Sequence, residues 1–158
     1  YIIENVGKAV LMSHLGRPKG EIKEEMRLKP VADRLGEILG ISVKSAPDCV
    51  GPEVEQMASD LGEGEVLMLE NLRFHKEEEL NDSDFAAKLA KLGDVYVNDA
   101  FGTAHRAHAS TTVIAQFFPN DKCFGLLLEK ELAGIDKVLH HLDPLISQTI
   151  LNLSKILS

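Results

Sequence analysis

The segment Val66-Leu-Met-Leu-Glu-Asn-Leu-Arg-Phe-His-Lys76 contains the pattern on which the predicted fold depends. It opens with a short, continuously apolar run, which is typical of a strand covered on both faces in a parallel sheet. Polar and charged residues begin at Glu70, so the strand is expected to end there and to continue into a loop. We therefore expect a buried strand whose carboxyl end leads into a loop that carries Arg73 and His75.

Similar apolar runs begin at Ala9, Val43, Val95 and Phe124, the last being Phe124-Gly-Leu-Leu-Leu128. Between the runs, apolar residues recur at helical spacing. The predicted helical stripes are Val31, Leu35, Ile38 and Leu39; Val54, Ala58 and Leu61; Phe85, Leu89 and Leu92; Val113 and Phe117; and Leu128, Leu132, Ile135, Leu139 and Leu142. Strand and helix alternate about every 25–30 residues, the rhythm of βαβ units. The expected fold is α/β, a three-layer, Rossmann-like, doubly wound parallel sheet.

Residues typical of helix boundaries accompany these stripes. They are Pro30 and Gly40 for the first helix, Pro52 and Gly62 for the second, Asn81 or Asp82 and Gly93 for the third, and Pro119 for the fourth.

The two ends of the chain predict a piece of a longer protein. Tyr1-Ile-Ile-Glu-Asn-Val-Gly7 is typical of the last turn of an amphipathic helix with a glycine stop, without the helix's beginning. At the other end, Pro144 is expected to break the last helix, and a new helical stripe continues to the final residue. We expect a domain over residues 1–142, incomplete at its N-terminus, and a separate helical tail over 143–158.

Composition excludes several classes of protein. The 158 residues include 17 Lys and Arg against 25 Asp and Glu, a net charge of −8, with 44% hydrophobic residues and two Cys. This excludes collagen-like, low-complexity and disulfide-scaffold proteins. The negative charge argues against nucleic-acid or membrane-surface binding, which both need a positive footprint. Without a signal sequence or a membrane span, a cytoplasmic location with two reduced cysteines is expected.

Three loops that follow predicted strands concentrate basic residues. They are Ser13-His-Leu-Gly-Arg-Pro-Lys-Gly20, Glu70-Asn-Leu-Arg-Phe-His-Lys76 and Asn98-Asp-Ala-Phe-Gly-Thr-Ala-His-Arg-Ala-His-Ala-Ser110. Ligands of open parallel sheets bind at the carboxyl ends of the strands, where such loops gather. The side chains expected to meet there are His14, Arg17, Arg73, His75, His105, Arg106 and His108.

A small, multiply charged anion is the expected ligand of this edge. Guanidinium groups held close together repel one another, and an anion relieves that repulsion. Arginine also offers paired donors to phosphate or carboxylate oxygens. Gly16, Gly20 and Gly102 are expected to let the main chain approach the ligand, and a helix opening after Arg106 would add N–H donors. A phosphorylated small molecule fits these requirements.

Structural interpretations of the same residues remain open. Arg73 alone is typical of a solvated loop residue, and His75 with the acidic run Glu77-Glu-Glu79 is typical of an exposed face. His105 and His108 are also consistent with capping or packing a turn. Asp99 is expected to orient a loop group rather than to bind a metal. Neither a P-loop nor a dinucleotide fingerprint occurs.

The three loops closely resemble the N-terminal domain of phosphoglycerate kinase. The resemblance runs in order from Tyr1 to about Leu139, and it includes Ala46-Pro-Asp-Cys49 and Leu128-Glu-Lys-Glu-Leu132. In that family, two Rossmann-like domains catalyse reversible phosphoryl transfer between 1,3-bisphosphoglycerate and ADP, giving 3-phosphoglycerate and ATP in glycolysis. The resemblance implies that this chain carries the side that binds 3-phosphoglycerate or 1,3-bisphosphoglycerate.

By motif, the resemblance implies substrate-binding roles for His14, Leu15, Gly16, Arg17, Arg73 and Arg106, with His105 and His108 as supporting basic residues. It assigns Mg-ATP or Mg-ADP to the C-terminal domain, for which no match occurs here. No cofactor, metal or certain catalytic residue is therefore expected in this chain, nor turnover by the chain alone. The family's opening strand is also unmatched. A non-catalytic anion-binding or interaction module on the same scaffold is the alternative.

Overall fold

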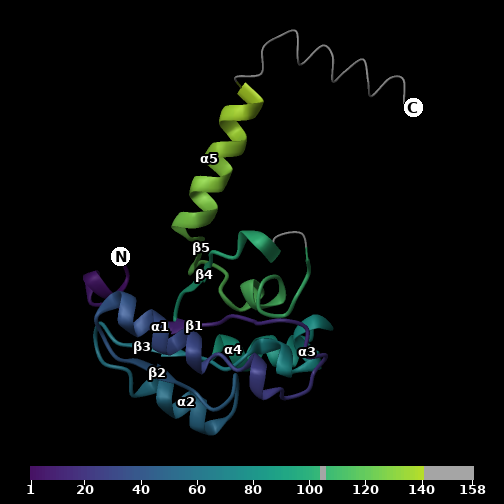
Figure 1. Ribbon diagram of the computed structural model, residues 1–158. Helices are drawn as coiled ribbons and strands as arrows, with labels where there is room; N and C mark the ends of the chain where they lie inside the picture. The colour runs from purple at the N-terminus through teal and green to yellow at the C-terminus, as the bar shows by residue number, and fades with distance from the viewer. Residues whose placement is uncertain (104–105, 141–158) are drawn as a thin grey trace.

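The computed structural model describes residues 1–103 and 106–140 of the chain (Figure 1). Its strands are β1 (Ala9–Leu11), β2 (Val43–Ser45), β3 (Val66–Met68), β4 (Tyr96–Asn98) and β5 (Lys122–Phe124). Its α-helices are α1 (Lys29–Leu39), α2 (Pro52–Ser59), α3 (Lys76–Glu79), α4 (Ser83–Ala90) and α5 (Leu126–His140). Short 3₁₀ helices are η1 (Ile3–Asn5), η2 (Glu24–Met26), η3 (Leu72–Phe74), η4 (Phe101–Thr103) and η5 (Val113–Phe117).

Strand β3 is the centre of a three-stranded parallel sheet with the order β1-β3-β2. All three of its residues are buried, as the continuous apolar run predicts. Strands β4 and β5 form a second parallel pair, and among the described residues no strand-to-strand hydrogen bonds join it to the first sheet. The parallel α/β class is confirmed, and its sheet consists of two parts.

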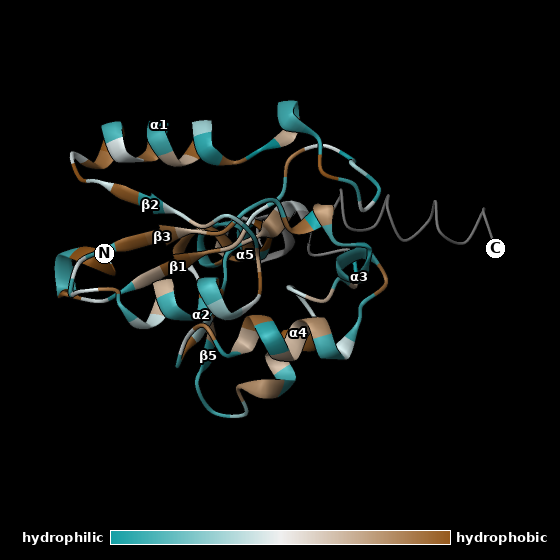
Figure 2. Ribbon diagram, turned by 90° about the horizontal axis from the view of Figure 1, so that it is seen from below, coloured by the Kyte–Doolittle hydropathy of each residue, from teal (hydrophilic) through white to brown (hydrophobic). Residues whose placement is uncertain are grey.

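Two apolar clusters cover opposite faces of the three-stranded sheet. On one face, Met68 packs with Leu28 and Ala32 at the start of α1. On the other, Leu67 and Leu69 pack with residues of α2, α4 and η5. Figure 2 shows α1 on one side of the strands and α2 and α4 on the other. This arrangement is the expected three-layer architecture.

The helix boundaries follow largely from local sequence. Gly40 ends α1 in a left-handed conformation, with a φ of 67°. The Asp82 carboxylate accepts a hydrogen bond from the Phe85 N–H at 2.7 Å and caps α4. Helix α5 extends away from the rest of the molecule (Figure 1), and its first turn is held by Asp99, whose Oδ1 accepts from the Leu128 N–H at 2.9 Å. Asp99 thus orients a chain segment, as expected.

Three local expectations were wrong. The fifth strand is Lys122–Phe124, and the leucines assigned to it begin α5 instead. The fourth helix is the 3₁₀ helix η5. At the N-terminus, the stop lies at Val6 in a left-handed conformation rather than at Gly7. The predicted tail over 143–158 lies outside the described residues. Among the described residues, we find no helix that is both long and apolar enough for a membrane span.

The central strand provides a first test of this packing. Leu67 is fully buried, so replacing it with Ala is expected to lower the free energy of unfolding by about 2–5 kcal/mol through lost burial and a cavity. Urea unfolding followed by circular dichroism measures the change. The control Ile38→Ala alters a side chain that is 67% exposed, and it should change stability by less than about 0.5 kcal/mol.

Candidate anion-binding site

Asn71 joins the loop after β3 to the loop after β1. The Asn71 side chain is fully buried, and its Nδ2 donates to the main-chain oxygens of Leu15 at 2.8 Å and Met26 at 2.9 Å. Its Oδ1 accepts from the Arg73 N–H at 3.1 Å. Because an unsatisfied buried amide is costly, these contacts hold the two loops in one arrangement.

Arg73 reinforces the same junction with a buried charge. Its side chain is 5% exposed, and Nη1 donates to the Gly16 carbonyl at 2.8 Å, while its own carbonyl accepts from the Gly20 N–H at 3.1 Å. The Nε atom is buried with no hydrogen bond among the described residues, and Glu79 Oε1 lies 3.7 Å from it. The interpretation of Arg73 as a solvated loop residue is therefore wrong, and its guanidinium retains a donor.

Gly16 and Gly20 are required by the shape of this loop. Both have left-handed φ angles, of 66° and 76°. A Cβ atom at Gly16 would lie 2.9 Å from the Met26 sulfur, and one at Gly20 would collide with the Lys76 side chain. The glycines thus allow close packing against side chains of the protein itself. Their expected role, which is to let the main chain approach a ligand, stays a prediction.

His14 lies within a cluster of positive groups. Burial lowers the pKa of its imidazole, and the charges of Arg73, His108 and Arg106 lower that pKa further because they disfavour the protonated ring. These interactions place groups from the ends of β1, β3 and β4 close together. The structure thus gathers His14, Arg73, Arg106 and His108 at one edge, although what they bind stays a prediction.

Glu78 holds in place the loop after β4 that carries His108. It is 3% exposed; its Oε1 accepts from Ser110 Oγ at 2.5 Å and its Oε2 from the Ser110 N–H at 3.0 Å. Its main-chain oxygen accepts from the Ala109 N–H at 3.0 Å, and Oε1 lies 3.9 Å from His108 Nδ1. The expectation of a wholly exposed acidic run is therefore wrong, because this carboxylate docks the loop that carries His108.

The remaining predicted site residues are Leu15, Arg17 and His105. Leu15 is 41% exposed and takes part through its carbonyl. Arg17 is exposed on the same loop. His105 lies outside the described residues. No α-helix opens directly after Arg106, so the expected helix N-terminus is wrong; turns lead into the short 3₁₀ helix η5.

His75 takes a different role from the one expected. Its Nε2 lies 2.6 Å from Asp48 Oδ1, and its ring is tilted against Phe85 with centroids 5.0 Å apart. Asp48, Cys49 and His75 together are the one group with metal-ligand spacing found among the described residues, with their ligand atoms within 4.8 Å of one another. Burial raises the pKa of the Cys49 thiol far above its ordinary value, so the thiolate that a metal requires is disfavoured. This group does not fit Mg²⁺, which prefers oxygen ligands.

Sequence reasoning missed the acidic and amide residues that build the site. Glu70 is buried and accepts from the Leu28 N–H at 2.9 Å, the Asn71 N–H at 2.8 Å and Arg27 Nη1 at 3.1 Å. The available signal was position: Glu70 and Asn71 directly follow a buried strand, where polar side chains tend to bind main-chain groups. No such signal distinguished Glu78 from its neighbours.

The fold and the site define a doubly wound α/β protein that gathers arginine and histidine at the carboxyl ends of parallel strands. Residues 1–149 match the family described as phosphoglycerate kinase. The phosphoglycerate kinase of Moorella thermoacetica is 58% identical over 88% of this chain and 35% of its own length. That of Chloroherpeton thalassium is 59% identical over 83% of this chain and 33% of its own length.

Solved structures agree with the sequence comparisons. Phosphoglycerate kinase from Pyrococcus horikoshii OT3 matches 90% of this chain with a TM-score of 0.79 and 34% identity, over 36% of its own length. The enzyme from Coxiella burnetii matches 86% of this chain with a TM-score of 0.72 and 33% identity, over 33% of its own length. This chain belongs to the phosphoglycerate kinase family, and it spans about a third of the length of these relatives.

The cluster around His14 has a measurable electrostatic consequence. Replacing Arg106 with Gln removes a positive neighbour, so the pKa of His14 is expected to rise toward its ordinary value of 6.5. Imidazole chemical shifts followed by NMR against pH measure this. Arg34→Gln, on the exposed surface of α1, is the control and should leave the pKa unchanged. An unchanged pKa in Arg106→Gln would contradict the proximity of the two groups.

The lowered pKa of His14 also makes the free energy of unfolding depend on pH. Because the folded state binds its proton less readily than the unfolded state, the His14 contribution is present above about pH 6.5 and is lost as the pH falls toward the folded pKa. Arg106→Gln should reduce this loss, which urea unfolding at a series of pH values measures.

The buried Glu78 carboxylate gives a separate test of the site's framework. In Glu78→Ala, the Ser110 N–H and hydroxyl lose their acceptor, which is expected to lower the free energy of unfolding by about 1–3 kcal/mol. Chemical shifts of residues 108–110 should change as well. The matched control is Glu77→Ala, because Glu77 is exposed and precedes it in the same acidic run. Equal effects of the two substitutions would contradict this role for Glu78.

Proposed function

We propose that this chain is the substrate-binding part of a phosphoglycerate kinase, which holds 3-phosphoglycerate or 1,3-bisphosphoglycerate through its basic loops. The observation that carries the proposal is the cluster of His14, Arg73, Arg106 and His108 on a chain with a net charge of −8. A phosphate or carboxylate placed there relieves the repulsion among these groups. Membership of the family supplies the choice of substrate.

The residues divide into two roles under this proposal. Arg106 and His14, with Arg17 and His105 on the same loops, contact the phosphate that is not transferred. Arg73 both positions a loop and contacts the ligand. Its Nη1 donates to the Gly16 carbonyl, and its Nε remains available as a donor. Asn71 and Glu78 are positioning residues, because their contacts are to the loops. Pre-formed loops lower the cost of ordering the site on binding.

The proposed reaction is reversible phosphoryl transfer between 1,3-bisphosphoglycerate and ADP, in glycolysis and in the cytoplasm. Catalysis of such transfers depends mainly on positioning and on electrostatic stabilisation. The magnesium nucleotide would be held by residues of the relatives' additional length, since the described residues of this chain offer no set of ligands suited to it. The chain alone is therefore expected to give no turnover.

Titration calorimetry with 3-phosphoglycerate tests the proposal. The chain should bind it, and Arg106→Ala should weaken binding by about tenfold or more, since a charge-assisted contact is lost. Arg34→Ala is the matched control on the far helix. Binding should also weaken as salt rises, because the interaction is electrostatic. A coupled kinase assay with ATP should show no turnover above background.

The alternative is a non-catalytic anion-binding module on the same scaffold. It predicts that sulfate competes as well as 3-phosphoglycerate at equal concentration, with no preference for the organic acid. A kinase substrate site predicts selective binding of 3-phosphoglycerate. Binding that is unaffected by Arg106→Ala would contradict both functions at this site.

A further inference from the structure

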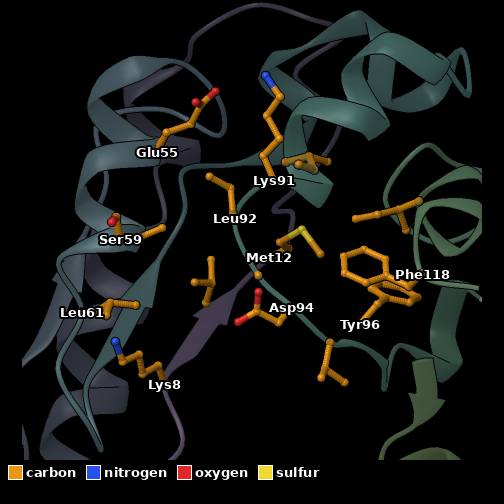
Figure 3. Close-up of a pocket in the computed structure, with 16 residues that line it drawn as sticks. Lys8, Met12, Glu55, Ser59, Leu61, Lys91, Leu92, Asp94, Tyr96 and Phe118 are labelled. Atoms are coloured by element: carbon orange, nitrogen blue, oxygen red, sulfur yellow. The ribbon is translucent and has the colours of Figure 1, made fainter. Parts of the chain in front are cut away.

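Asp48, Cys49 and His75 lie together beyond the carboxyl ends of β2 and β3. Asp48 and Cys49 belong to the loop between β2 and α2, and His75 follows η3 in the loop after β3. A cavity of about 550 Å³ is lined by other residues, among them Tyr96 and Phe118 (Figure 3). The three side chains therefore form a separate polar group of the molecule.

Hydrogen bonds between the loops after β2 and β3 fix the positions of these side chains. The Ala46 N–H donates to the Met68 oxygen at 2.9 Å. The Glu70 N–H donates to the main-chain oxygen of Asp48 at 3.4 Å, and Cys49 Sγ donates to the Glu70 carbonyl at 2.9 Å. Asp48 Oδ1 also accepts from the Cys49 N–H at 2.6 Å. Groups held in place in this way lose little freedom when they bind a ligand.

The three side chains are spaced closely enough to bind one small cation. A carboxylate oxygen of Asp48, Cys49 Sγ and a ring nitrogen of His75 lie within 4.8 Å of one another, and His75 Nε2 is 2.6 Å from Asp48 Oδ1. Zinc bonds of about 2.3 Å to sulfur and about 2.0–2.2 Å to nitrogen or oxygen place tetrahedral ligand atoms about 3.3–3.7 Å apart. Changes of about 1 Å in these separations therefore give the coordination geometry of zinc.

One side of the group is open to solvent. Cys49 is fully buried, whereas the side chain of His75 is 26% exposed and that of Asp48 is 50% exposed. A cation would enter from the side of Asp48, and a water molecule would take the fourth position. Three protein ligands with one open position are typical of zinc sites that exchange their fourth ligand.

Negative charge around Cys49 favours a cation. Burial raises the pKa of the Cys49 thiol most, and the charges of Asp48, Glu70 and Glu78 raise that pKa further. The same carboxylates attract a divalent cation, and the charge of a coordinated cation deprotonates the thiol. The thiol proton leaves to solvent, and Cys49 coordinates as the thiolate.

We propose that Asp48, Cys49 and His75 form a binding site for a borderline-soft divalent cation, of which Zn²⁺ best fits a set of one sulfur, one nitrogen and one oxygen ligand. Mg²⁺ and Ca²⁺ prefer oxygen ligands and do not fit this set. The cation would replace the hydrogen bond between His75 and Asp48 and would link the loops after β2 and β3. The proposal does not depend on which anion the basic loops bind.

Cobalt(II) gives a direct test, because it occupies zinc sites and its bond to a thiolate produces charge-transfer absorption in the near ultraviolet. The full chain, kept reduced by a phosphine, should show this absorption as CoCl₂ is added, with saturation at one ion per chain. An equal concentration of Zn²⁺ should displace Co²⁺ and remove the absorption. The same concentration of Mg²⁺ should leave it unchanged.

Substitutions identify the ligands. Cys49→Ala should remove the charge-transfer absorption, and its matched control Cys123→Ala, at the exposed cysteine, should keep it. Asp48→Asn and His75→Gln should each weaken Co²⁺ binding by about tenfold or more, since each removes a ligand. Asp84→Asn, on the exposed surface of α4, should leave the affinity unchanged. Circular dichroism checks the fold of each variant, and Asp48→Asn, at a half-exposed side chain, tests the site if Cys49→Ala does not fold.

Three outcomes would overturn the proposal. One is the absence of charge-transfer absorption at Co²⁺ concentrations up to about 1 mM, and another is absorption that Cys123→Ala removes. Absorption that appears only with a cobalt-dependent dimer would assign the metal to a contact between two copies instead. If the chain binds 3-phosphoglycerate but shows no cobalt–thiolate absorption, the metal site is refuted and the proposed function remains intact.

Discussion

The loop after β1 depends on hydrogen bonds that its carbonyl oxygens accept from side chains following β3. Asn71 and Arg73 provide these donors to Leu15 and Gly16, and both are buried. Because buried polar groups are costly when unpaired, the two loops adopt one joint conformation rather than two independent ones. The buried central strand therefore determines where the basic residues of the neighbouring loop lie.

Carboxylates support the positive cluster from within the protein. Glu70 binds the N–H groups at the start of α1 and after β3, and Glu78 binds the loop that carries His108. Glu79 lies near Arg73. These acidic groups balance part of the local charge. The pKa of His14 is lowered first by burial and then by the charges of Arg73, His108 and Arg106, while Glu79 opposes that lowering. A chain with an overall negative charge thus keeps a local cluster of basic side chains at this edge.

The basic loops come from both parts of the divided sheet. The basic loops gather at the carboxyl ends of β1, β3 and β4, although β1 and β4 belong to different parts of the sheet. The helical layer beneath bridges the two parts through one apolar cluster that includes Leu67, Phe85 and Ile114. Within the part of the chain that the structure describes, apolar packing rather than main-chain pairing between β1 and β4 therefore holds the two parts together.

The sequence alone determined the parallel α/β class, most strand and helix positions, and the loops that carry the basic side chains. These features depend on local patterns: continuous apolar runs, caps such as Asp82, and glycine stops such as Gly40. Local patterns also explain the wrong fifth strand, because Leu126–Leu128 satisfy an apolar run and a helical stripe equally well. Only the tertiary structure decided that Glu78 is buried, that His75 pairs with Asp48, and that Asn71 holds the loops after β1 and β3 together. Each of these depends on contacts between residues distant in the chain, which neither composition nor spacing encodes.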